Sequence, residues 1–152
     1  MLSKNKQSES LTLLAKASVD QASQLLVPYF SSKVQAGFPS PADDHLEFKL
    51  DLNELVIKHP AATFFVRAQG DSMVDAGIHS GDLLVVDRSL TACHGKIVIA
   101  ALDGELTLKR LHISEGKVWL VAANPSYPPI DIGENREMVI WGVVTFVIHQ
   151  TT

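Results

Sequence analysis

Beyond Leu46 the chain consists of short apolar runs separated by turns that contain glycine or aspartate. Asp103 and Gly104, placed between two of these runs, are the strongest short-range signal for a β-hairpin in the sequence. Many short strands with few helices predict a mainly β body, either a sandwich or one coiled sheet. The strands are expected at 63–68, 83–87, 97–102, 106–111, 117–122 and 139–148.

The N-terminal part has a different pattern. Residues 10–27 place leucine and alanine at roughly helical spacing, which predicts a helix that ends at Pro28. The following residues, 31–41, contain serines, a glycine and two prolines, which are typical of a linker or an extended arm. The N-terminal arm is therefore expected to be partly helical.

A second, shorter helix is predicted over 51–59, where Pro60 would end it. At 152 residues the chain has room for a single core. The expected organisation is an N-terminal arm at 1–36, a linker at 37–50 and a β-rich domain at 51–152.

Charge is unevenly distributed between the arm and the body. Residues 1–36 carry four lysines against one glutamate and one aspartate, which gives this part a net charge of +2. The formal net charge of the whole chain is −4, so the remaining residues have a net charge of −6. An acidic body lacks the excess of positive charge that binds a phosphate backbone. We therefore expect no direct binding of the folded body to duplex DNA.

The sequence also indicates the compartment. Cys93 is the only cysteine, which excludes an internal disulfide and fits a reducing environment. The longest apolar runs, 97–102 and 139–148, are too short to span a membrane, and the N-terminus is too polar for a signal-peptide core. These features predict a cytoplasmic protein without a membrane anchor.

Ser72 and Lys109 together could form the reactive centre of a hydrolase. Serine is a poor nucleophile until a base removes its proton. A lysine can be that base where burial makes its amine neutral near pH 7. Ser72 follows a glycine-containing turn, and Lys109 lies in an otherwise apolar run.

Strand alternation places Thr107, Lys109 and Leu111 on one face of the predicted strand and Arg110 on the other. Taken singly, each reactive residue has an ordinary explanation. Lys109 would then extend from a sheet edge into solvent, and Ser72 would be a turn or helix-capping serine.

The bond between Ala36 and Gly37 is a candidate for self-cleavage. It lies in the expected extended segment, with a small side chain before the bond and a permissive backbone after it. Val34, two residues before Ala36, could fill an apolar pocket of a peptidase. The Ala-Gly dipeptide alone does not predict self-cleavage, because cleavage also requires a nucleophile and a base elsewhere in the chain.

These features occur in an order that resembles the UmuD branch of the LexA-type self-cleaving serine peptidases. The resemblance covers residues 34–148. The segments that carry it are AGFPSP at 36–41, FVRAQGDSM at 65–73, SGDLLVVD at 80–87, DGELTLKRL at 103–111, ANPSYPPI at 123–130 and WGVV at 141–144.

The resemblance implies a role for each candidate residue. Ser72 would be the nucleophile, Lys109 the general base, and the bond between Ala36 and Gly37 the one that is cut. The backbone N–H groups of Asp71 and Ser72 are the expected donors to the oxyanion. The scheme uses no metal and no organic cofactor.

The resemblance also implies a biological setting. Such proteins are homodimers that are cut in the SOS response when a RecA filament on single-stranded DNA stimulates cleavage. The shortened form then serves as an accessory subunit of an error-prone, UmuC-type translesion polymerase. Two alternatives remain open at this stage. One is a LexA-like repressor without its DNA-binding domain, and the other is a non-enzymatic module for dimerisation or polymerase binding.

The remaining reactive side chains show no pattern of their own. Cys93 and His94 are adjacent and lack the spacing of a zinc motif, and the six histidines are scattered along the sequence. A Ser-His-Asp triad would require the fold to bring a histidine to the serine. The sequence therefore predicts no metal site.

Overall fold

The computed structural model describes residues 24–30, 33–37 and 47–152. The chain divides into two compact units, Met1–Leu55 and Val56–Thr152. Most of the helix expected over 10–27 lies outside the described residues.

The first unit contains a two-stranded antiparallel sheet. Strand β1, Leu26–Phe30, pairs with β2, Glu47–Asp51. The prediction that a helix continues to residue 27 and ends at Pro28 is therefore wrong, because these residues belong to β1. The valine, tyrosine and phenylalanine of this stretch favour a strand, and proline is tolerated in a strand with a free edge.

A short helix follows β2. Helix α2 spans Leu52–Val56, and the Asp51 carboxylate accepts a hydrogen bond of 2.9 Å from the Asn53 backbone N–H in its first turn. It is shorter than the predicted 51–59, and a 3₁₀ turn, Pro60–Ala62, comes before the next strand. Across the described residues, no helix has the length and apolarity needed to cross a membrane.

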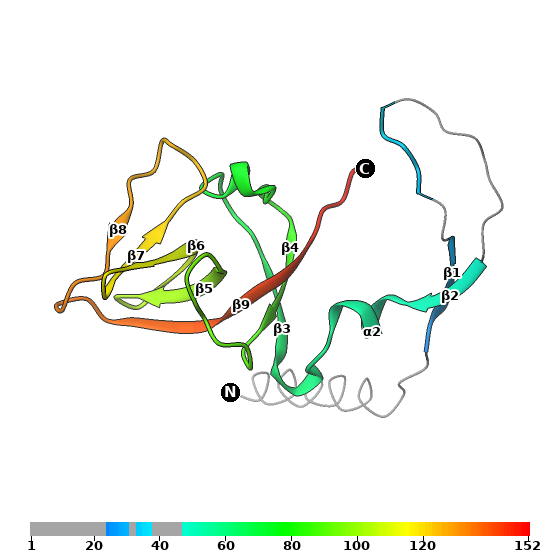
Figure 1. Ribbon diagram of the computed structural model, residues 1–152, viewed down its shortest axis with the longest axis horizontal. Coiled ribbons are helices and arrows are strands. Elements are labelled where there is room, and N and C mark those ends of the chain that lie inside the picture. The colour runs from blue at the N-terminus through cyan, green and yellow to red at the C-terminus, as the bar shows by residue number, and fades with distance from the viewer. Residues whose placement is uncertain (1–23, 31–32, 38–46) are drawn as a thin grey trace, which may run out of the picture. The chain divides into compact units, whose positions relative to one another are not determined.

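The second unit is built on a seven-stranded antiparallel sheet, as expected for a mainly β body. Its strands are β3 Thr63–Arg67, β4 Leu83–Asp87, β5 Ile97–Leu102, β6 Glu105–Ser114, β7 Lys117–Val121, β8 Ile130–Asp131 and β9 Met138–Ile148. They lie in the order β3-β4-β9-β5-β6-β7-β8. The last strand in sequence, β9, thus lies inside the sheet, and Figure 1 shows it running between β4 and β5.

The predicted hairpin between β5 and β6 is present. Leu102 pairs with Glu105, and the two turn residues, Asp103 and Gly104, have φ values of +50° and +86°. Positive φ at both central positions is the requirement of the tight hairpin turn that Asp-Gly sequences favour. This turn sets the register of β6 and therefore the face on which its side chains lie.

The sheet is strongly coiled and has apolar clusters on both faces. Ile99 of β5 packs in one cluster, whereas its neighbours Val98 and Ala100 pack in the other. Register shifts interrupt the pairing of β9 with β4 and with β5, and such bulges increase the local twist. One coiled sheet can therefore bury residues on both of its faces.

Candidate active site

Ser72 lies in the connection between β3 and β4, which spans residues 68–82. Gly70 begins the turn with a φ of +87°, and its N–H donates a 3.1 Å hydrogen bond to the Ser80 hydroxyl. Met73 is 2% exposed, and its Sδ accepts a 3.4 Å hydrogen bond from the Ala123 N–H. The buried methionine fixes the turn in the core and leaves the adjacent Ser72 partly exposed.

Lys109 comes from the middle of β6 and is 9% exposed. Its Nζ lies 3.3 Å from Ser72 Oγ, 3.0 Å from Thr107 Oγ1 and 3.1 Å from the Leu108 carbonyl oxygen. Within the described part of the chain, no carboxylate forms an ion pair with this amine. Lys109 is therefore surrounded by neutral acceptors.

Burial lowers the pKa of the Lys109 amine below its ordinary value, because desolvation disfavours the charged form. A charged amine donates a hydrogen bond to Ser72 Oγ. A neutral amine can instead accept the proton of the Ser72 hydroxyl across the same contact. The separation of 3.3 Å is slightly longer than the ~2.6–3.2 Å of a nucleophile–base pair, which is often looser before substrate binds. The arrangement is the one that a Ser–Lys hydrolase needs.

Arg110 does not take part in this cluster. Its Nη1 donates a 2.8 Å hydrogen bond to the Gly95 carbonyl, whereas the Lys109 amine contacts Ser72. The alternation expected for this strand explains the difference, since adjacent side chains point to opposite faces.

Two further residues hold the segment that precedes Ser72. The Tyr127 hydroxyl donates a 2.6 Å hydrogen bond to the Asp71 carboxylate, and Asn124 Nδ2 donates one of 3.0 Å to the Asp71 carbonyl. The hydrogen bond to the carboxylate raises the pKa of Tyr127. The sequence reasoning gave these residues no role, although both lie in the ANPSYPPI segment that contributed to the resemblance.

The backbone N–H groups of Asp71 and Ser72 are the expected oxyanion donors. In the part of the chain that the structure describes, the N–H groups of Asp71 and Ser72 donate to no protein acceptor. Asp71 is instead held through its carbonyl and its carboxylate.

The candidate scissile bond lies in the first unit. Ala36 and Gly37 form an exposed bend, and Val34 is 95% exposed. A Cβ built on Gly37 would meet no atom within 4 Å. This segment has the exposure that a protease substrate requires.

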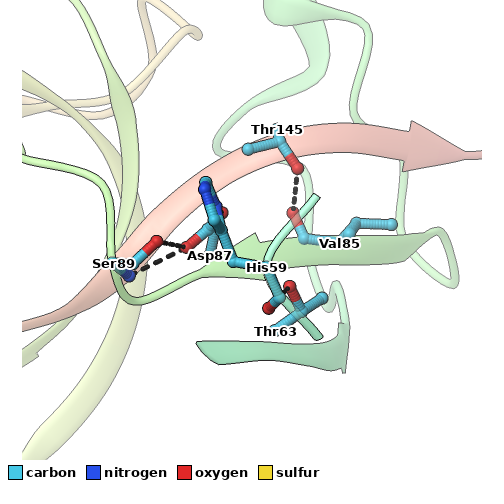
Figure 2. Close-up of polar contacts among 6 residues, drawn as sticks. All are labelled: His59, Thr63, Val85, Asp87, Ser89 and Thr145. Carbon is cyan, nitrogen blue, oxygen red and sulfur yellow. Dashed lines mark hydrogen bonds and ion pairs between the residues drawn. The ribbon is translucent and has the colours of Figure 1, made fainter. Parts of the chain in front are cut away.

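A serine, an aspartate and a histidine also meet elsewhere in the second unit, as Figure 2 shows. Asp87 accepts hydrogen bonds of 2.6 Å from the Ser89 hydroxyl and of 2.8 Å from the Ser89 N–H, and His59 Nδ1 lies 2.6 Å from its other oxygen. These contacts lower the pKa of Asp87 to about 2, and the hydrogen bond from the Ser89 hydroxyl makes the largest contribution. In a catalytic triad the histidine stands between the other two residues. Here the aspartate does, so the cluster is not a triad.

The fold is thus accompanied by a serine and a buried lysine in hydrogen-bond contact, and comparison with known families defines the class as peptidase. A family model described as Peptidase S24-like matches residues 28–145, and the chain belongs to this family. The membership confirms the family expected from the sequence motifs and its peptidase role in SOS mutagenesis.

Three similar proteins illustrate the match. Protein SamA of Salmonella typhimurium strain LT2 is 49% identical over 139 residues, which cover 91% of this chain and 96% of SamA. Protein ImpA of Escherichia coli is 51% identical over 82% of this chain and 84% of its own length. Protein MucA of Escherichia coli is 47% identical over 78% and 82%, respectively.

Proposed function

We propose that the chain is a self-cleaving serine endopeptidase in which Ser72 is the nucleophile and Lys109 the general base. The observation that carries this proposal is the buried Lys109 amine 3.3 Å from the Ser72 hydroxyl. The lowered pKa of the amine increases the fraction that is neutral and able to accept a proton.

The reaction follows from these two groups. Neutral Lys109 takes the Ser72 proton, and Ser72 Oγ attacks the carbonyl carbon of Ala36. The Asp71 and Ser72 N–H groups stabilise the negative oxygen of the tetrahedral intermediate. The bond to Gly37 then breaks as Lys109 returns the proton to the leaving amine, and water hydrolyses the acyl group on Ser72.

The biological role is proposed from the family. The protein acts as a homodimer, and a RecA filament on single-stranded DNA stimulates its cleavage in the SOS response. The shortened product, residues 37–152, is an accessory subunit of a UmuC-type translesion polymerase. The acidic body supports a role through protein contacts, since its net charge of −6 disfavours binding to a phosphate backbone.

Single substitutions test the catalytic pair. The purified full chain is incubated at alkaline pH, and the fragments are identified by N-terminal sequencing. Ser72→Ala and Lys109→Met should abolish the fragment that begins at Gly37. Ser114→Ala and Lys117→Met change exposed residues of the same types and should cleave at the normal rate.

The methionine at position 109 keeps the volume of the lysine stem, so loss of cleavage cannot be attributed to a cavity. Circular dichroism should show that both inactive variants remain folded. If either Ser72→Ala or Lys109→Met still produces the fragment, the assignment of the pair is wrong.

The partners are tested separately from the chemistry. RecA-coated single-stranded DNA should accelerate cleavage of the full chain, whereas RecA without DNA should not. A UmuC-type polymerase should bind the 37–152 fragment more tightly than full-length Ser72→Ala, which remains uncut. Equal binding of the two forms would show that shortening does not control the polymerase.

A further inference from the structure

A second cluster of reactive side chains lies outside the Ser72 site. Asp82 immediately precedes β4, His79 lies in the same β3–β4 connection, and His149 immediately follows β9. His149 Nδ1 is 2.6 Å from Asp82 Oδ1, and His79 Nδ1 is 3.8 Å from Asp82 Oδ2. The two imidazole rings approach each other with centroids 5.3 Å apart.

The three side chains have the chemistry and spacing of transition-metal ligands. One ligand atom from each residue lies within 4.8 Å of the other two. A tetrahedral zinc ion with bonds of about 2.0–2.1 Å holds its ligand atoms about 3.3 Å apart. The imidazoles are about half exposed, so small side-chain rotations suffice to reach that spacing.

The carboxylate at the centre is positioned before any ion binds. Asp82 is 2% exposed, and its Oδ2 accepts a 2.8 Å hydrogen bond from the His79 backbone N–H. That bond and the contact to His149 fix the orientation of the carboxylate. Carboxylates that ligate metal ions are themselves usually held by hydrogen bonds of this kind.

We propose that His79, Asp82 and His149 bind a divalent transition-metal ion, with zinc as the first candidate. Two imidazoles and a carboxylate are a known three-ligand set for zinc, which leaves a fourth position for water. The ion would replace the hydrogen bond between His149 and Asp82. It would thereby fasten the end of β9 to the connection that carries Ser72.

The proposed site links two segments that are far apart in the sequence, the residues before β4 and the end of β9. Asp82 and His149 are 67 residues apart in sequence, and strand pairing already brings Leu83 opposite Ile148. An ion bound at this point would reinforce the pairing of β4 with β9 where β9 ends. Binding to the folded chain should therefore raise its melting temperature.

The test is a titration of the tag-free, full-length chain with zinc chloride by isothermal calorimetry. We expect one ion per chain, and a rise of several degrees in melting temperature that a chelator reverses. His79→Ala and His149→Ala should each weaken binding about tenfold or more. His112→Ala is the matched control, because His112 also faces a second histidine ring, His94, at 4.8 Å.

A measurement on the unaltered chain guards against variants that fail to fold. Paramagnetic Co²⁺ should shift the amide NMR signals of residues 79–83 and 147–150 more than others. The proposal is overturned if no saturable binding occurs, if His112→Ala weakens binding as much as His149→Ala, or if Co²⁺ shifts signals elsewhere.

Discussion

Thr107→Val should increase the rate of self-cleavage at neutral pH. Thr107 Oγ1 is the nearest hydrogen-bond acceptor of the Lys109 amine, at 3.0 Å. Valine keeps the shape of the side chain and removes this acceptor. Loss of this hydrogen bond destabilises the charged amine of Lys109 more than the neutral amine, because hydrogen bonds to charged groups are stronger. The substitution should therefore lower the pKa of Lys109 further.

The size of the effect follows from the two kinds of hydrogen bond. A bond to a charged group contributes about 1.5–3 kcal/mol and a neutral one about 0.5–1.5 kcal/mol, a difference of about 1 kcal/mol. A free-energy difference of about 1.4 kcal/mol corresponds to a factor of ten in an equilibrium constant, so about 1 kcal/mol corresponds to about fivefold, and the pKa of Lys109 falls accordingly. Below the pKa this raises the neutral fraction, and with it the cleavage rate, about fivefold.

The assay is the rate of self-cleavage measured on gels from about pH 7 to about pH 10, a range that approaches the ordinary pKa of lysine. The rate of the unaltered chain should rise with pH and then level off as Lys109 becomes neutral. In Thr107→Val the rising part should move to lower pH, with the same plateau. Thr145→Val is the control, because it removes a hydroxyl that bonds the Val85 carbonyl in another part of the sheet (Figure 2). A rising part that stays in place or moves to higher pH would refute the reasoning.

Three further predictions concern the turn before Ser72, an ionised buried group and the packing of β9. Tyr127→Phe removes the 2.6 Å hydrogen bond to Asp71 and should slow self-cleavage several-fold; a matching loss of melting temperature would instead indicate a role in stability. The pKa of Asp87, lowered from 3.8 to about 2, means that its ionised form stabilises the fold above about pH 4 and that this contribution is lost as the pH falls to about 2. The difference in melting temperature between the unaltered chain and Asp87→Asn should therefore shrink over that range, and a constant difference would contradict the assignment. Gly142→Ala would place a Cβ 2.6 Å from a side-chain carbon of the neighbouring strand and should lower the free energy of unfolding by about 1–3 kcal/mol in urea. Gly133→Ala, with no atom within 4 Å, should leave it unchanged, and equal effects of the two would exclude a clash as the cause.

Strands with a strong local pattern were predicted accurately. The runs at 83–87 and 97–102 coincide with β4 and β5, because continuous apolar residues bounded by turns leave little ambiguity. The two residues of β8 were missed, since so short a strand has no period to detect. The expected helix end at Pro28 was wrong because pairing with β2 outweighed the helical spacing of the preceding leucines.

The structure brings together Ser72 and Lys109, the two residues that the sequence singled out, but their contacts do not follow from the sequence. Strand alternation assigned Lys109 and Leu111 to one face, and both are buried in the structure. The family motifs identified Ser72 as the other partner. The support that Tyr127 gives to Asp71 does not follow from spacing along the chain, whereas the period of two already placed Thr107 on the same face as Lys109.

The sequence by itself determined the strands, their turns and the face of β6 that carries Lys109, because these depend on neighbouring residues and on a period of two. Only the tertiary structure brought Lys109 to Ser72, which is 37 residues away, and His149 to Asp82. Burial and the pKa of an amine depend on the packing of distant segments, which no local pattern encodes. The chemistry of this protein arises from that packing.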